Sequence, residues 1–144
     1  MLIGGKSADQ NVLYVLDALR RIKRDGDGTN SVAIFRCDSE KNYFVQVLGQ
    51  RGKRLVFTES VSNEFLESEH ALNSAQMAQL ITLGWNPPRG ENRPNYFHWW
   101  TATDDADLLQ IARNLMLTCT RVYGFRLDRA LEIDVWLSTG YTRV

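Results

Sequence analysis

Three runs of β-branched and aromatic residues decide the fold, and they lie within SVAIFRCDSEKNYFVQVLGQRGKRLVFTESV, residues 31–61. The runs SVAIFRC, NYFVQVLG and KRLVFTESV are separated only by the short polar segments DSEK and QRG. Runs of this composition favour β-strands, and short polar connections between them favour hairpins. The stretch therefore predicts an antiparallel meander of three strands.

Side chains along a strand alternate between the two faces of a sheet, and here both faces are largely apolar. In the middle run, Tyr43, Val45 and Val47 point to one face of the sheet. The alternate residues Phe44, Gln46 and Leu48 point to the other face. A sheet that is apolar on both faces needs cover on more than one side, because exposed apolar surface is unfavourable in water.

Before this stretch, the sequence predicts a helix over roughly residues 8–25. Ser7 and Gln10 have the spacing of a capping box, and apolar residues then recur at helical period: Val12, Val15, Leu16, Leu19 and Ile22. The basic run RRIKR, residues 20–24, lies at the C-terminal end of this helix, where the helix dipole favours cations. We interpret it as a solvated helix end and not as a nucleic-acid patch.

After the stretch, a short helix capped by Asn73 or Ser74 should end at Gly84, and NYFHWWTA, residues 95–102, predicts a fourth strand. A helix should follow from Thr103 and Asp104 to Gly124, and LEIDVWL, residues 131–137, alternates as a strand with one solvated face. The order αβββαβαβ favours an α+β fold in one domain, residues 1–144, with a twisted antiparallel sheet packed with helices.

The composition predicts a cytoplasmic protein without membrane or nucleic-acid partners. The 144 residues carry 17 basic and 17 acidic side chains, so the formal net charge is zero, and no apolar stretch approaches bilayer length. Cys37 and Cys119 lie in apolar surroundings, so buried free thiols are the simpler interpretation and a disulfide is the alternative.

We expect no enzymatic activity, metal or cofactor. The only histidines, His70 and His98, have no neighbouring ligands at metal-binding spacing, and the sequence has no phosphate-binding glycine loop, nucleophile elbow or paired cysteine motif. Carboxylates that meet only in the fold would escape such a search.

The segment LGWNPPRGENRPNYFHWW, residues 83–100, holds all three prolines and three of the four tryptophans. Pro87 and Pro88 prevent the preceding helix from continuing, and the polar RGENRPN should form an exposed loop. In the strand that follows, Phe97 and Trp99 share one face, and the other carries Tyr96, His98 and Trp100. About half of these aromatics should face the core, and we expect the others to form a protein or peptide contact surface.

The chain resembles the TY-Chap group of bacterial domains, which is related to the YbjN family and to the small chaperones of type III secretion. The resemblance covers about residues 7–124. It rests on five motifs: VQVLGQ (45–50), TESVSNEFL (58–66), LGWNPP (83–88), RPNYFHWW (93–100) and DLLQIARNLMLTCTRVYG (107–124). The resemblance implies a secretion-chaperone-like fold in which an antiparallel sheet packs against helices, often as a homodimer, and binds peptide segments of client proteins.

The resulting hypothesis is a non-enzymatic chaperone-like domain that holds a client segment on an apolar, aromatic sheet surface. From the matched motifs and the strand face expected to be exposed, we predict five contact residues: Trp85, Tyr96, His98, Trp100 and Asn63. The alternative is a YbjN-like regulatory or scaffold module that binds one folded partner. Binding to client fragments would favour the chaperone, and binding only to an intact protein would favour the scaffold.

Overall fold

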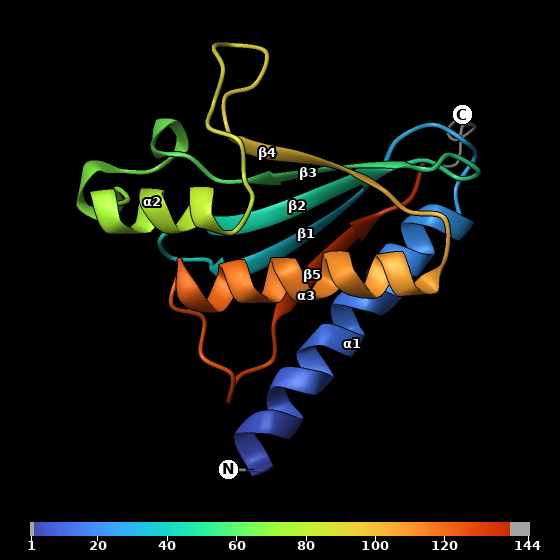
Figure 1. The fold of residues 1–144 in the computed structure, drawn as a ribbon, viewed down its shortest axis with the longest axis horizontal. Helices are drawn as coiled ribbons and strands as arrows, with labels where there is room; N and C mark the ends of the chain where they lie inside the picture. The colour runs from blue at the N-terminus through green and yellow to red at the C-terminus, as the bar shows by residue number, and fades with distance from the viewer. Residues whose placement is uncertain (1, 139–144) are drawn as a thin grey trace.

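The predicted meander forms the centre of a five-stranded antiparallel sheet, in the strand order β4-β3-β2-β1-β5 (Figure 1). The structure is a computed structural model, and it describes residues 2–138. The strands are β1 (Ser31–Asp38), β2 (Tyr43–Gly49), β3 (Leu55–Ser60), β4 (Tyr96–Thr101) and β5 (Glu132–Trp136). All neighbouring strands pair antiparallel, so the predicted sheet type is confirmed.

The helices are α1 (Leu2–Arg24), α2 (Ser74–Thr82) and α3 (Asp105–Arg121), which confirms the order αβββαβαβ and the α+β class. Two short 3₁₀ turns that were not predicted, Asn63–Phe65 and Ser68–His70, lie between β3 and α2. The predicted start of the first helix at residue 8 is wrong, because α1 already begins at Leu2. Extending an existing helix gains one hydrogen bond per residue, and this outweighs the low helix propensity of Gly4 and Gly5.

Helices cover only one face of the sheet. Figure 1 shows α1 and α3 across one side of the strands, with α2 beside the C-terminal end of α3. Residues on this covered face alternate with more exposed ones along β1, β2 and β3. The most deeply buried large apolar side chains come from all three helices, the covered face and the residue after β3: Val15, Leu19, Ile22, Phe35, Val45, Val47, Val56, Val61, Leu80, Ile111 and Leu115. The core therefore lies between the sheet and the helix layer.

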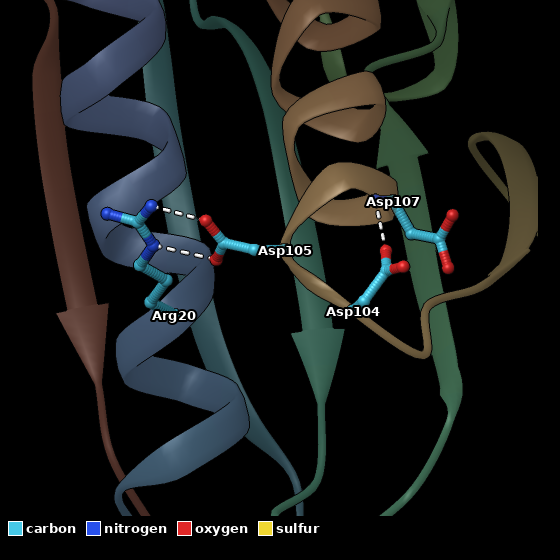
Figure 2. Close-up of polar contacts among 4 residues, drawn as sticks. All are labelled: Arg20, Asp104, Asp105 and Asp107. Atoms are coloured by element: carbon cyan, nitrogen blue, oxygen red, sulfur yellow. Dashed lines mark hydrogen bonds and ion pairs between the residues drawn. The ribbon is translucent and has the colours of Figure 1, made fainter.

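An ion pair ties the two long helices together at the surface. Arg20 of α1 donates from Nε and Nη2 to the two carboxylate oxygens of Asp105, at 2.8 and 2.5 Å, and Figure 2 shows the two parallel contacts. The hydrogen bond from Arg20 holds the pKa of Asp105 below its ordinary value. Both side chains are exposed to solvent, so the pair contributes little to the free energy of folding. Its main effect is on the orientation of the two helices.

Aspartates fix the beginning of α3. Asp104 is its N-cap, and its carboxylate accepts a hydrogen bond from the backbone N–H of Asp107 at 2.9 Å (Figure 2). The Asp107 carboxylate in turn accepts from the backbone N–H and the hydroxyl of Thr103, at 2.9 and 3.0 Å. These bonds lower the pKa of Asp107, and the negative charges suit the positive end of the helix dipole.

The short helix α2 ends as the sequence predicts. Asn73 caps its N-terminus in a capping box with Gln76, and Gly84 adopts a φ of 101° after its C-terminus. The backbone N–H of Trp85 then returns to the carbonyl of Leu80 at 3.1 Å. Because the chain reverses here, the Trp85 side chain is directed back against the helix layer.

Cys37 of β1 and Cys119 of α3 are free and buried, as predicted. Their sulfur atoms lie 2.6 Å apart. Burial and the neighbouring thiol raise the pKa of Cys37 well above its ordinary value, so this thiol stays protonated at neutral pH.

We therefore expect neither thiol to react readily in the folded protein. A thiol reagent such as DTNB should label Cys37 and Cys119 only after denaturation, because the attacking species is the exposed thiolate. Denaturation without reductant should release two reactive thiols. Release of none would show that the pair is oxidised to a disulfide, and rapid labelling of the folded protein would contradict the burial.

We also expect the stability contributed by Asp107 to be lost in acid. Its pKa is lowered on folding, so its contribution is complete above the unfolded pKa, about 3.9, and disappears as the pH falls through the folded value. Asp107→Asn should lower the free energy of unfolding at pH 7, and urea titrations should show the difference from wild type shrinking below about pH 4. Thr103→Val, which keeps the backbone donor, should reproduce only part of the loss. A difference independent of pH would contradict this assignment.

Candidate functional site

The sheet face opposite the helices, called the open face below, is the candidate site. None of the three α-helices described over residues 2–138 covers it. Its side chains alternate with the buried ones along each strand: Val32, Ile34 and Arg36; Phe44, Gln46 and Leu48; Leu55, Phe57 and Glu59; Phe97, Trp99 and Thr101; Glu132, Asp134 and Trp136. Most of those on β1 and β2 are only half-buried.

One row of apolar side chains crosses the entire open face. The strand register places them directly opposite one another from β5 to β4: Trp136, Val32, Leu48, Phe57 and Trp99. Residues opposite each other on antiparallel strands share a face and lie in contact distance. The two tryptophans at the ends are 71% and 47% exposed. The row spans four inter-strand spacings, roughly 19 Å.

The proline-containing loop adds two arginines to the open face. Asn86 pairs with Phe97 on the outer edge of β4, through backbone hydrogen bonds of 2.8 and 3.1 Å, and the loop then closes on itself where Arg89 pairs with Arg93. The guanidinium group of Arg93 lies 5.1 Å from the centre of the Phe57 ring, and that of Arg89 lies 5.6 Å from the Phe97 ring. Both are cation–π distances.

A groove of about 720 Å³ opens between this loop and the β2–β3 turn. The apolar floor of the groove consists of Leu48, Leu55, Phe57 and Trp99. The centres of the Phe57 and Trp99 rings are 4.6 Å apart. Cationic side chains at the rim are Lys53, Arg54 and Arg93. The groove therefore combines an apolar floor with positive charge.

Two of the predicted contact residues belong to the core. Trp85 is only 3% exposed, and its indole N–H donates to the hydroxyl of Thr118 on α3 at 3.0 Å. Tyr96 is 7% exposed, and burial raises the pKa of its hydroxyl. The expectation that these side chains lie at an exposed surface is wrong, because the strand register turns Tyr96 toward the helices and the turn after Gly84 turns Trp85 inward.

The expected exposed side of β4 is also reversed for His98 and Trp100. Both side chains are half-buried on the covered face, with their rings edge to face and 4.8 Å apart. The Trp100 indole donates to the hydroxyl of Thr58 at 3.2 Å, and its ring packs against the core. The neighbours Phe97 and Trp99 occupy the open face instead.

Asn63 is exposed, as expected, but lies away from the groove in the 3₁₀ turn after β3. Its side-chain amide exchanges two hydrogen bonds with the backbone of Leu72, at 2.6 and 3.3 Å. These bonds join the two ends of the segment between β3 and α2. Asn63 therefore has a structural role. The structure therefore does not bring the five predicted residues together at one site.

Sequence reasoning missed Leu48, Leu55, Phe57 and Trp99 as groove residues. The alternation in β3 gives no usable signal, because Leu55 and Phe57 on the open face are more apolar than the buried Thr58 and Ser60. Those buried hydroxyls are satisfied: Thr58 donates to the carbonyl of His98 at 2.9 Å, and Ser60 lies 2.6 Å from the hydroxyl of Tyr123. Their burial therefore depends on hydrogen bonds to distant segments and not on hydrophobicity.

No group of three or more histidine, cysteine, aspartate or glutamate side chains in residues 2–138 could hold a metal ion. Within the same range, none of the helices combines the length and the apolar character required to cross a bilayer.

One comparison with known proteins gives a match. Residues 16–137 match the model of the TY-Chap3 family, described as type III secretion system (YopN, CesT) and YbjN peptide-binding chaperone 3. The chain belongs to this family. Membership of TY-Chap3 confirms the resemblance to TY-Chap domains and supports a chaperone-like binding role. No curated protein and no solved structure gives a significant match to this TY-Chap3 chain.

Two tryptophan substitutions should separate the core from the open face of the TY-Chap3 domain. Trp85→Ala should lower the free energy of unfolding by about 3–5 kcal/mol, because it creates a cavity and leaves Thr118 without its donor. Trp99→Ala should lower it by about 1 kcal/mol or less, because the side chain is largely exposed. Urea denaturation measures both, and equal losses would contradict the assignment of the two faces.

Proposed function

We propose that this TY-Chap3 protein is a non-enzymatic, cytoplasmic chaperone that binds an extended segment of a client protein on the open face. The observation that carries the proposal is the apolar row from Trp136 to Trp99, which no helix covers in the described part of the chain. Exposed apolar surface bordered by polar residues marks interaction sites. The family description supplies the class of ligand, a peptide.

The dimensions of the row suit an extended chain. A row of roughly 19 Å matches about six residues of extended backbone at about 3.3 Å each. Apolar side chains at alternate positions of such a segment would enter the groove beside Phe57 and Trp99, and the polar side chains between them would point toward the rim and the solvent. Aromatic side chains give large contact area at low entropic cost, so Trp99 should contribute most to the affinity.

A homodimer is also part of the proposal. Leu13 and Tyr14 of α1 are 57% and 51% exposed, so the helix layer also presents large apolar side chains to solvent. A dimer formed through α1 would leave the open face of each copy free for a client.

The proposal predicts that Trp99→Ala weakens peptide binding without unfolding the protein. The probe is a fluorescein-labelled peptide of about ten residues in which phenylalanine alternates with serine, so that it is apolar on one side when extended. Anisotropy titration should show affinity reduced about tenfold or more for Trp99→Ala, and also reduced for Trp136→Ala. Phe65→Ala is the matched control, because Phe65 is similarly exposed, at 45%, but does not line the groove.

Light scattering on the same samples would distinguish a client site from a contact between two copies. If Trp99→Ala changes the molar mass of the protein, the open face is an interface of the dimer and the proposal is wrong. Equal peptide affinity for wild type, Trp99→Ala and Trp136→Ala would also overturn it.

A further inference from the structure

The groove of the open face carries positive charge only. Three cationic side chains line it: Lys53 and Arg54 in the β2–β3 turn, and Arg93 in the loop before β4. Among the described residues, none of these three forms an ion pair within 4.0 Å of a carboxylate. The chain as a whole is neutral, so this local excess is offset elsewhere.

In the part of the chain that the structure describes, no carboxylate lines the groove itself. Glu59 lies opposite Phe97 in the next row of the open face, and it keeps its negative charge while its carboxylate accepts a hydrogen bond from the Gln46 amide at 2.7 Å. Glu91 is exposed in the loop and has no ion-pair partner among the described residues. At the far side of the sheet, Asp134 is paired with Arg36 at 2.9 Å. The lining of the groove is therefore basic, and the acidic residues of the open face lie outside it.

The two arginines of the loop are held where a ligand would meet them. Arg93 lies over the rings of Phe57 and Phe97, at 5.1 and 6.0 Å from their centres. A guanidinium group that stacks on a ring still presents its N–H donors at its edge, and those donors fit a carboxylate. A carboxylate beside an apolar side chain of a ligand would thus find both an apolar floor and a preorganised donor.

We infer that the groove selects client segments in which apolar residues alternate with acidic ones. This inference rests on the proposed function, because it names the class of peptide for the same surface. The phenylalanine or leucine side chains of such a segment enter the groove beside Phe57 and Trp99, and its carboxylates contact Arg93 and the β2–β3 turn. A basic segment would place like charges next to the three unpaired cations.

Single-stranded nucleic acid is the other ligand that an aromatic, basic groove could accept. The observations favour a peptide. The floor includes the aliphatic side chains Leu48 and Leu55, on which bases do not stack, and the chain has no net positive charge. The family is also described as peptide-binding. A short oligothymidylate therefore belongs in the experiment as a competing ligand.

The test compares three labelled peptides with the same alternating phenylalanine residues and with serine, glutamate or lysine between them. At low salt the wild-type protein should bind the glutamate peptide about tenfold or more tighter than the lysine peptide, with the serine peptide between them. At ionic strength well above 0.1 M, where the Debye length is about 10 Å or less, the preference should shrink. The oligothymidylate should bind more weakly than the glutamate peptide.

Charge reversal tests whether the cationic residues of the β2–β3 turn cause the preference for acidic peptides. The double variant Lys53→Glu and Arg54→Glu should abolish the preference for the glutamate peptide over the lysine peptide. The matched control is Arg113→Glu with Arg121→Glu, which makes the same change in net charge at exposed positions of α3. This control should keep the preference, because the two positions lie on the helix layer, and thermal denaturation should show all variants folded.

The outcomes separate this inference from the proposed function. Equal binding of all three peptides, with affinity still lost in Trp99→Ala, would overturn the acidic preference and leave the client site standing. Binding of none of the peptides would overturn the proposed function itself. A preference that survives Lys53→Glu with Arg54→Glu but disappears in the α3 control would place the site on the helix layer. Tighter binding of oligothymidylate than of any peptide would identify a nucleic-acid groove.

Discussion

The structure depends on one imbalance: the sheet is apolar on both faces, and the helices are sufficient to cover one. Val45 and Val47 of β2 are fully buried beneath the helix layer, whereas Phe44 and Leu48 of the same strand are only half-buried on the other side. Burial of apolar area is the main favourable contribution to folding, so the covered face stabilises the fold. The open face retains apolar area that no helix of the described residues 2–138 removes from water.

The loop before β4 makes that face specific. Pro87 and Pro88 stop the chain from continuing as a helix, the pairing of Asn86 with Phe97 brings the loop back to the sheet edge, and Arg93 is thereby placed over Phe57. Without the loop, the face would be a bare apolar row. With the loop, the face has a groove with a basic rim, so that ligands can be distinguished by their charge.

The same imbalance explains which sequence predictions failed. Alternation along β4 correctly divides its aromatics into two sets, but both sets are aromatic, so composition does not indicate which set faces the helices. The pairing partners decide it: Trp100 lies opposite the buried Val56, and Trp99 opposite the half-buried Phe57. In β3, hydrophobicity would favour the wrong face, because Thr58 and Ser60 are buried through hydrogen bonds that no local pattern reveals.

By itself, the sequence determined the order of the α-helices and strands, the turn at Gly84 and the family, because each of these depends on residues close together in the chain or on a motif. It left the cap of α2 between Asn73 and Ser74, and the structure decided on Asn73. Tertiary structure alone decided which face of the sheet the helices cover. It also decided that Trp85 and Tyr96 are core residues, and that the arginines of one loop meet the phenylalanines of two strands. The physical reason is that local periodicity fixes the relative orientation of neighbouring side chains, whereas burial depends on contacts between segments far apart in sequence, such as the hydrogen bond from Trp85 to Thr118.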